Sequence, residues 1–380
     1  MAKLIEITGK ALSGEWGTDD ETGDGIPVLR TTNFTNEGVV DYRNVVTRTI
    51  TKKKIEEKYL RKGDIIIEKS GGSDKQPVGR VIFFDGPEQT YLFNNFTGLL
   101  RVKDQTTWYP RYVFYSMYSN YRRGGTRAFE NKTTGLHNLK TDDYVSRYEV
   151  SETSMENQME ICERLDRLYG IIKMRKQELQ LLDELIKARF VELFGDPIKN
   201  PKGWEVVTIG DIVTEVRYGT SRPAVEGGKY PYLRMNNLTS DGHLDLNDLK
   251  YIDIPDDEIE KCVVRKGDVL FNRTNSIELV GKTAVFDLPN DMIIAGYIIR
   301  VRLNERILPE VLSQYMNLEA LKDILRSMAK GAVNQANINA QELQSIKVYI
   351  PDMGTQKKFI EMKEQVDKSK VAVQKALDET

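Results

Sequence analysis

The sequence predicts an α+β protein in which two strand-rich domains of one design alternate with two long helices. Three observations lead to this prediction. Apolar residues recur at heptad spacing in mid-chain, segments of the first half recur in order in the second half, and a second heptad helix closes the chain. We expect domains at 1–152 and 196–351, and helices at 153–195 and 352–380 that form an antiparallel two-helix coiled coil.

The mid-chain helix is predicted from apolar residues at alternating four- and three-residue steps. They are Ile161, Leu165, Leu168, Ile172, Leu179, Leu182, Ile186 and Leu193. At about 1.5 Å per residue, roughly 40 residues form a helix about 60 Å long. This length is greater than that of a core helix in a compact domain. We interpret it as a spacer that packs lengthwise on another helix.

An internal repeat relates the two halves of the chain. The matching segments are 26–38 with 230–242, 61–64 with 265–268, Arg101-Val102 with Arg300-Val301, Pro110 with Pro309, and Gln158 with Gln356. The separation decreases in small steps, as a few loop deletions in the second copy would cause. We therefore expect one structural unit that is used twice.

Each unit is expected to be a domain of roughly 150 residues, a common size. A Lys-Gly-Asp turn leads into an apolar strand, short strands follow, and a helix then opens at Pro110 or Pro309. The closing helix is shorter and more polar than the first and would be marginal alone. Its expected partner is the mid-chain helix, and the chain direction makes the pair antiparallel.

Composition excludes some classes of protein. The 380 residues carry a net charge of −2, although the segment 101–140 is locally basic. Two cysteines and two histidines argue against a disulfide framework and a histidine-built metal site. No apolar run is long enough for a signal peptide or a membrane span, so we expect a cytoplasmic protein.

A basic and aromatic segment at 108–127 is one candidate binding surface. Arg122, Arg123 and Arg127 flank two glycines, where a backbone can approach a partner closely, and a DNA phosphate is the expected anion. The interleaved aromatic residues have a simpler explanation, since an amphipathic helix would bury them.

The loops that follow the two Lys-Gly-Asp strands form a second candidate surface. Their polar side chains are of the types that read base edges, namely Lys69, Ser70, Ser73 and Lys75 in the first copy and Arg273, Thr274 and Asn275 in the second. Alternatively these are ordinary polar loops. Four further residues repeat between the copies and could either contact DNA or stabilise the framework of each domain. They are Arg30, Arg234, Asn33 and Asn237.

A second apolar strip runs beside the heptad seam of the mid-chain helix. It contains Ile171, Met174, Leu181 and Leu185. A two-helix pair cannot bury so wide a face, so a partner protein should cover it. Alternatively, a second copy of this chain buries the strip in a homodimer.

No catalytic site can be assembled from the sequence. Glycine-rich nucleotide loops and the short methyltransferase motifs Asn-Pro-Pro-Tyr and Asp-Pro-Pro-Tyr are absent. Asp64, Glu68 and Lys69 loosely resemble a nuclease cluster, but adjacent strand residues point to opposite faces.

These elements together resemble the specificity (S) subunit of type I restriction–modification enzymes. The resemblance covers essentially the whole chain. It is carried by the two Lys-Gly-Asp strands, the Ile-Pro and Tyr-Pro segments ending in Asn-x-Thr, Leu193 to Pro197 with Trp204, and Ile350-Pro351-Asp352 followed by Gln356. The first copy departs from the pattern, because Glu149-Val150-Ser151 stands where the second has Ile-Pro.

The resemblance implies a non-catalytic subunit that binds a two-part target in double-stranded DNA. Each repeat would be a target-recognition domain, and the helices would dock methyltransferase (modification) subunits, with restriction subunits as further partners. S-adenosylmethionine would belong to the methyltransferase, and ATP and Mg²⁺ to the restriction subunit. The alternatives are a nuclease or DNA methyltransferase with an unrecognised site, and a protein-binding scaffold.

Overall fold

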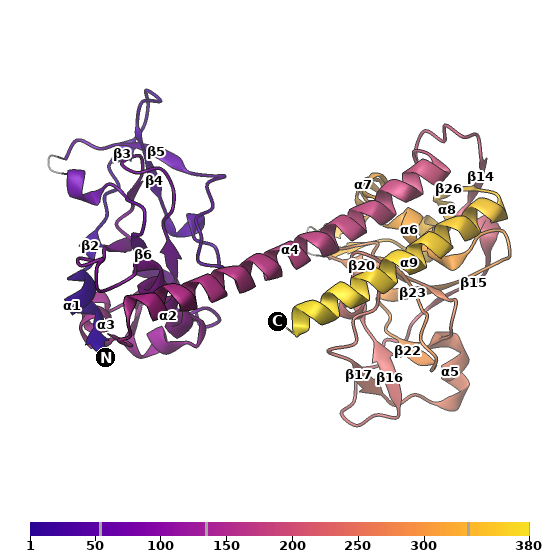
Figure 1. Ribbon diagram of the computed structural model, residues 1–380. Helices are drawn as coiled ribbons and strands as arrows, with labels where there is room; N and C mark the ends of the chain where they lie inside the picture. The colour runs from indigo at the N-terminus through magenta and orange to yellow at the C-terminus, as the bar shows by residue number, and fades with distance from the viewer. Residues whose placement is uncertain (53–54, 134–135, 333–334, 380) are drawn as a thin grey trace. The chain divides into compact units, whose positions relative to one another are not determined.

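The computed structural model describes residues 1–52, 55–133, 136–332 and 335–379. The chain forms two compact units, Met1–Ile171 and Ile172–Thr380 (Figure 1). The boundary between them lies inside the 40-residue helix α4 (Met155–Phe194), which is the long helix predicted at 153–195. None of the described helices combines the length and the apolar character that a membrane span requires.

The first unit is built from short strands and a few helices. Its strands are β1 (Ala2–Lys3), β2 (Leu12–Ser13), β3 (Thr18–Asp19), β4 (Ile26–Leu29), β5 (Val46–Thr49), β6 (Ile65–Glu68), β7 (Ser70–Gly72), β8 (Val81–Phe83), β9 (Leu92–Phe93), β10 (Thr97–Leu100), β11 (Glu130–Thr133), β12 (Leu136–Leu139) and β13 (Glu149–Val150). Its helices are α1 (Leu4–Thr8), α2 (Pro110–Arg122), α3 (Thr141–Arg147) and the start of α4, with 3-10 turns η1 (Thr31–Asn33), η2 (Glu56–Lys58) and η3 (Gly125–Phe129).

The second unit has the same kind of composition. Its strands are β14 (Glu205–Thr208), β15 (Val213–Tyr218), β16 (Tyr230–Leu233), β17 (Lys250–Ile252), β18 (Val263–Val264), β19 (Val269–Asn272), β20 (Thr274–Asn275), β21 (Thr283–Val285), β22 (Met292–Ile294), β23 (Ile298–Leu303), β24 (Lys330–Ala332), β25 (Gln335–Asn337) and β26 (Lys347–Ile350). Its helical elements are η4 (Ile209–Ile212), η5 (Met235–Asn237), α5 (Asp256–Cys262), α6 (Pro309–Met316), α7 (Glu319–Met328), α8 (Ala340–Ser345) and α9 (Met353–Asp378), with the end of α4.

The sheets of the two units correspond one to one, as the repeat predicts. The sheet β2-β10-β6-β8 has its counterpart in β15-β23-β19-β21, and β11-β12-β7 in β24-β25-β20. In both units a parallel pair, β4 with β9 or β16 with β22, stands in an otherwise antiparallel sheet. The pairing β1-β13 recurs as β14-β26. The fold is therefore α+β with a duplicated strand-rich domain.

The Lys-Gly-Asp turn is explained by backbone geometry and a buried ion pair. Gly63 and Gly267 have φ of 91° and 92°, a region that favours glycine. The carboxylate of Asp64 accepts from the Arg61 N–H at 2.8 Å and forms an ion pair with Arg101 at 2.7 Å. This turn fixes the start of β6 and, in the second unit, of β19.

The turn of the second unit makes the same two interactions, but its ion pair uses Arg302 and not Arg300, the residue that the sequence match had aligned with Arg101. Asp268 accepts from the Arg265 N–H at 2.9 Å and pairs with Arg302 at 2.9 Å. The strand register pairs Leu100 with Ile65 and Val301 with Val269, so Arg101 corresponds to Arg302. The predicted match with Arg300 was wrong by two residues, because β23 is longer than β10 and carries two arginines, Arg300 and Arg302, on either side of Val301.

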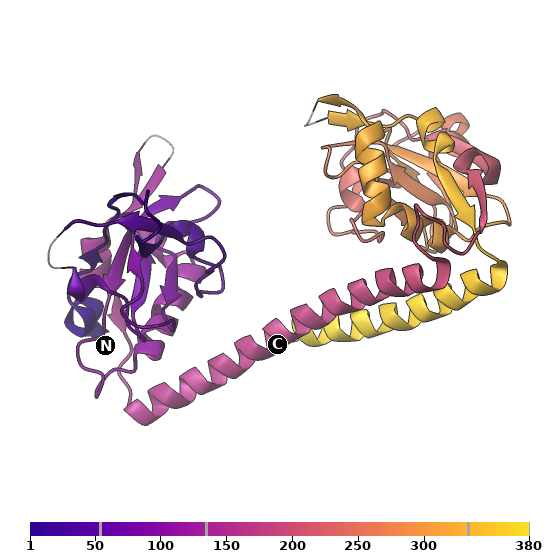
Figure 2. The same cartoon turned by 90° about the horizontal axis from the view of Figure 1, so that it is seen from above.

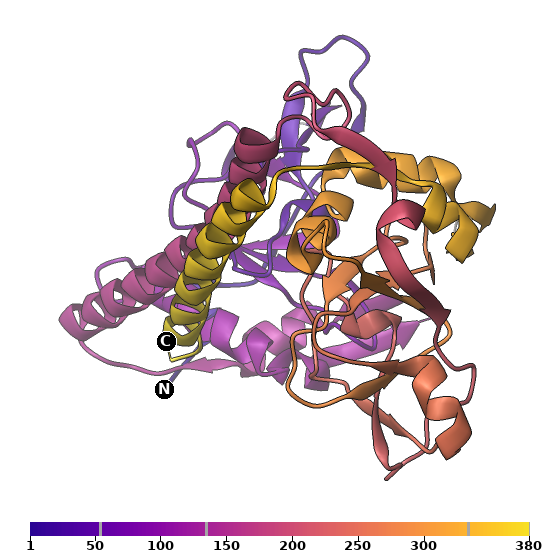
Figure 3. The same cartoon turned by 90° about the vertical axis from the view of Figure 1, so that its right-hand side faces the viewer.

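Helix α9 packs antiparallel on the C-terminal half of α4, as predicted (Figures 2 and 3). The rings of Phe190 and Phe359 lie 5.2 Å apart, and near the other end Lys370 forms an ion pair with Asp183 at 2.5 Å. Ile186 and Val366 are buried in the same cluster. The chain thus pairs its two heptad segments within the second unit.

The N-terminal half of α4 buries a face that only partly overlaps the predicted seam. Ile161 and Leu168 are each 41% exposed, whereas Cys162 is buried in the core of the first unit with Leu165 and Tyr169 packed against it. Burial raises the pKa of the Cys162 thiol to about 12. The seam therefore holds for the C-terminal half of α4, whereas before Ile172 the buried face shares only Leu165 with it. There α4 packs on the first domain and not on α9, and Tyr169 stacks on Tyr115 of α2.

Candidate nucleic-acid interface

Lys69 and Arg273 occupy equivalent positions directly after the central strands β6 and β19. The Lys69 N–H donates to the Phe96 carbonyl at 2.8 Å, and the Arg273 N–H donates to the Tyr297 carbonyl at 2.9 Å. The carbonyl of Lys69 accepts from Leu139, as that of Arg273 accepts from Ile338. One long cationic side chain therefore stands at the same end of the central strand in each domain.

The Lys69 side chain lies against the sheet and is half-buried. Its Nζ donates to Ser13 Oγ at 2.8 Å, and its stem passes Gly98, where an added Cβ would stand 3.5 Å from Lys69 Cδ. Burial lowers the pKa of Lys69, because the charged ammonium loses hydration. The ammonium is thus held in one place on strand β2.

The Arg273 guanidinium lies over the ring of Tyr218, with Cζ 4.9 Å from the centroid. Its Nη1 makes a long contact of 3.5 Å to the Gly296 carbonyl, and its buried Nε has no hydrogen-bond partner among the described residues. The register places Tyr218 opposite Ile299 and Ser13 opposite Gly98, so Tyr218 and Ser13 are equivalent positions. The sequence did not connect either residue with a cation, because the pairing of distant strands cannot be derived from the repeat.

The strands that follow use part of their polar groups within the fold. Thr274 is 9% exposed, and its hydroxyl donates to Asn337 Oδ1 at 2.9 Å. The Asn275 amide donates to Asn272 Oδ1, and its Oδ1 accepts from the Ser276 N–H. Thr274 and Asn275 therefore shape the edge on which Arg273 stands.

In the first unit the loop after β7 meets the 3-10 turn η3, which follows helix α2. Ser70 lies on β7 and is partly exposed, while Ser73 and Lys75 are exposed in the loop. Arg127 Nη2 donates to the Asp74 carbonyl at 3.1 Å, which joins the two surfaces that the sequence suggested separately.

The C-terminal end of α2 and the following 3-10 turn η3 are basic and exposed. Arg122, Arg123 and Arg127 are exposed, and within the described ranges no ion pair engages Arg122 or Arg123. Gly124 has a φ of 75°, which ends the helix in the left-handed region. The aromatic side chains of α2 face inward: Phe114, Tyr115, Tyr118 and Tyr121 are all buried. The arginines, and not the aromatics, form the accessible surface of this segment.

The repeated Arg and Asn residues that follow β4 and β16 hold the framework, which was the alternative left open. Asn33 Oδ1 accepts from the Arg30 N–H at 2.9 Å and its Nδ2 donates to the Asp41 carbonyl at 2.9 Å. Asn237 makes the equivalent bond to the N–H of Arg234 at 2.8 Å. These side chains are occupied by backbone groups.

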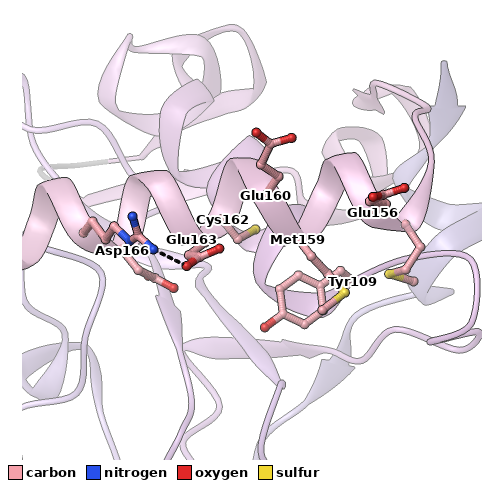
Figure 4. A pocket seen from close by; sticks show the side chains of 9 residues that line it. Tyr109, Glu156, Met159, Glu160, Cys162, Glu163 and Asp166 are labelled. Atoms are coloured by element: carbon pink, nitrogen blue, oxygen red, sulfur yellow. Dashed lines mark hydrogen bonds and ion pairs between the residues drawn. The ribbon is translucent and has the colours of Figure 1, made fainter.

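The second strip of α4 is exposed along the helix. The exposed fractions are 40% for Ile171, 61% for Met174, 63% for Leu181 and 42% for Leu185. Met174, Leu181 and Leu185 line a shallow groove of about 450 Å³. The larger hollow beside α4 in the first unit, about 970 Å³, is lined by acidic side chains together with Met155, Met159 and Tyr109 and contains no predicted DNA-binding residue (Figure 4).

The carboxylates considered for a nuclease site are engaged in ion pairs. Asp64 pairs with Arg101, and Glu68 pairs with Arg80 at 3.2 Å. His137 Nδ1 lies 3.0 Å from Glu130. Across the ranges that the structure describes, no group of three or more His, Cys, Asp or Glu side chains could hold a metal ion.

Comparison with known proteins gives consistent matches. A family model of the type I restriction modification DNA specificity domain matches residues 2–184 and 201–380. The EcoKI specificity subunit of Escherichia coli K12 is 23% identical over 90% of this chain and 75% of its own length. A putative MjaX specificity subunit of Methanocaldococcus jannaschii is 32% identical over 42% of this chain and 38% of its own. The S subunit structure from M. genitalium shares the fold, with a TM-score of 0.58 at 16% identity, over 100% of this chain and 91% of its own.

Proposed function

This chain belongs to the type I restriction–modification DNA specificity family, a non-catalytic DNA-recognition component of its complexes, and we propose how its residues divide that task. In the proposal each repeat reads one half of a two-part target in double-stranded DNA. Lys69 and its loop read the first half, and Arg273 and its strand edge read the second.

The equivalent placement of Lys69 and Arg273 carries this proposal. Residues that repeat in type and contact, such as Asp64 and Asp268, hold the framework of both units. Lys69 and Arg273 repeat in position but differ in side chain and in neighbour, Ser13 or Tyr218. Two domains that recognise different short DNA sequences need the same framework but different base-contacting side chains. Lys69 and Arg273 meet this requirement at one equivalent position.

Guanine is the base that these cations favour. Lysine and arginine donate to O6 and N7 of guanine in the major groove, and each good bidentate contact discriminates by about 1–3 kcal/mol. The Tyr218 ring lies under the Arg273 guanidinium, and within the part of the chain that the structure describes the Nη groups make no hydrogen bond shorter than 3.5 Å. We therefore propose a guanine in the half-site read by the second unit.

Arg122, Arg123 and Arg127 are proposed to hold phosphates of the first half-site. Across the described ranges Arg122 and Arg123 have no carboxylate partner, so their exposed guanidinium groups are available to an anion. The contact of Arg127 with the 73–75 loop places this charge next to Ser73 and Lys75. Phosphate contacts at this place would fix the register in which the loop meets the bases.

The exposed strip of α4 is proposed as the docking surface for a methyltransferase subunit. We infer that S-adenosylmethionine is bound by that subunit, and ATP and Mg²⁺ by restriction subunits. Met174→Glu and Leu181→Glu should reduce assembly with the methyltransferase in size-exclusion chromatography. Lys176→Glu is the control and should assemble normally, because Lys176 is exposed and lies about 200° from Met174 around the helix, on the side opposite the strip.

Methylation mapping tests the proposed function directly. The chain is co-expressed with its cognate methyltransferase subunit, and methylated positions are mapped genome-wide. We expect one two-part motif with a gap of fixed length. A continuous motif, or methylation without sequence preference, would contradict the proposal.

A further inference from the structure

Phe96 and Tyr297 stand opposite the two cations in their domains. The ladder pairs Glu68 with Thr97, and one residue further the hydrogen bond from the Lys69 N–H to the Phe96 carbonyl continues the same register. In the second unit Asn272 pairs with Ile298, and the Arg273 N–H donates to the Tyr297 carbonyl. Directly opposite residues of an antiparallel pair project from the same face, with Cβ atoms about 5 Å apart.

These two rings are the most exposed aromatic side chains among the described residues. Phe96 is 53% exposed and Tyr297 is 51% exposed, followed by Tyr251 at 44%, Tyr218 at 43% and Tyr42 at 40%. A single exposed apolar side chain is ordinary on a protein surface. That the two most exposed rings occupy the same position of a repeated domain, each beside the cation, points to a shared use.

Both rings are carried by tight turns that the sheet holds in place. The Thr97 N–H donates to the Asn94 carbonyl at 3.1 Å and its hydroxyl to the same carbonyl at 2.8 Å. The Ile298 N–H closes the equivalent turn onto Ala295 at 2.8 Å. The Asn272 amide adds a bond of 3.2 Å to the Tyr297 carbonyl. Little conformational freedom is therefore left for these turns to lose on binding.

We propose that Phe96 and Tyr297 each stack on a base of the half-site that their own domain reads, an inference that rests on the proposed DNA-recognition function. The feature common to both side chains is a flat ring, since only tyrosine has a hydroxyl and phenylalanine cannot read a base edge by hydrogen bonding. Proteins insert apolar rings between base steps, and they place aromatic rings beside cations to stack bases. Sequence preference then also comes from how easily a given step opens.

The experiment uses the complete complex of this chain with its methyltransferase subunits and the target found by methylation mapping. 2-Aminopurine, whose fluorescence rises when its stacking on neighbouring bases is broken, is placed at successive positions of each half-site. The variants are Phe96→Ala, Phe96→Leu, Tyr297→Ala and Tyr297→Phe. Tyr42→Ala and Tyr251→Ala, which remove exposed rings elsewhere in the same two units, are the controls.

We expect wild-type binding to raise the fluorescence at one step in each half-site. Phe96→Ala should abolish the signal in the first half-site only and weaken binding about 10-fold, within the range of one base–aromatic stack. Phe96→Leu should behave like Phe96→Ala, because leucine keeps an apolar side chain but no ring face. Tyr297→Ala should act on the second half-site only, and Tyr297→Phe should bind like wild type.

Three results would overturn the proposal. The first is a wild-type complex that binds its target with no fluorescence change at any position. The second is a loss of affinity that disappears when deoxyuridine replaces every thymine, which would indicate contact with a thymine methyl group. The third is an Ala variant that fails to assemble with the methyltransferase, which would indicate a protein contact. Failure of the DNA-recognition function itself looks different, since the wild-type complex would then prefer no sequence.

Discussion

Gln158 and Gln356 make the same hydrogen bonds at the starts of α4 and α9. The Oε1 atom of each accepts from a backbone N–H before the proline-initiated helix, that of Tyr109 or Leu308, at 2.9 Å in both cases. Each Nε2 donates to two backbone carbonyls, those of Thr107 and Thr153 or of Arg306 and Pro351. A buried glutamine thus ties each long helix to its own domain.

Replacing either glutamine by alanine should destabilise the unit that contains it. Gln158→Ala and Gln356→Ala leave buried backbone groups without partners, and each such group costs about 1–3 kcal/mol. Thermal unfolding of the variants should show the loss. Gln180→Ala is the control, because Gln180 is exposed and, among the described residues, its side chain bonds to the exposed Glu184 alone. Equal melting temperatures for Gln158→Ala and Gln180→Ala would contradict this role.

Lys322 should make stability depend on pH. Its side chain is 9% exposed and donates to the Gly281 carbonyl, and burial lowers its pKa from 10.5 to about 7. Between pH 7 and about 10 the unfolded chain holds a proton that the folded chain lacks, so this group adds stability as pH rises, by about 1.4 kcal/mol per unit. Below pH 7 that contribution is absent.

Chemical denaturation at pH 7 and pH 9 checks this sign. Lys322→Met should remove the gain in unfolding free energy between the two pH values, whereas Lys266→Met, at an exposed lysine of the same unit, should keep it. A gain that persists in Lys322→Met would have another titrating group as its source.

The arginines of α2 and η3 should control the salt dependence of DNA binding. Arg122→Ala and Arg123→Ala should each weaken binding to all sequences alike and reduce the salt slope by about one unit. Arg127→Ala should also loosen the 73–75 loop, since it loses the bond to the Asp74 carbonyl. Arg147→Ala, an exposed arginine on α3, is the control. If Arg122→Ala, Arg123→Ala and Arg127→Ala all left the salt dependence of DNA binding unchanged, these arginines would not bind DNA phosphates.

Gly170 tests whether α4 sets the spacing of the two half-sites. An added Cβ at Gly170 meets nothing within 4 Å, so Gly170→Ala should stabilise the helix by about 0.5–1 kcal/mol and keep the recognised gap. Gly170→Pro costs about 3 kcal/mol and kinks the helix. Selection from a library of gap lengths should therefore yield one gap for Gly170→Ala and a broadened or lost preference for Gly170→Pro. If Gly170→Pro still selected a single gap of unchanged length, α4 would not determine the distance between the two half-sites.

The duplicated fold was predictable because the residues that hold its framework are the ones that repeat. Several repeated side chains form hydrogen bonds with backbone groups that need a partner in any copy of this fold. They are the carboxylates of Asp64 and Asp268 and the amides of Asn33, Asn237 and Gln158. Such residues recur in both halves and are visible in one sequence. The α+β class and the antiparallel helix pair follow from them.

The surroundings of the cations were not predictable, since strand register determines them. Ser13 reaches Lys69 from a strand more than fifty residues away in sequence, and Tyr218 reaches Arg273 in the same manner. The exposure of Phe96 depends on which face of a two-residue turn is covered. Heptad spacing likewise could not show that Ile161 lies on the solvent side of α4, because spacing alone does not tell a helix partner from a domain surface.

The most direct test of the central claim is methylation mapping of complexes that carry Lys69→Ala or Arg273→Ala. Lys62→Ala and Lys266→Ala, at exposed lysines of the two Lys-Gly-Asp turns, are the matched controls. If each domain reads its own half-site, Lys69→Ala relaxes base preference in one half of the motif and Arg273→Ala in the other, while the gap and both controls stay unchanged. Complexes that assemble normally but show an unaltered motif, or altered preference in both halves from a single substitution, would contradict the claim.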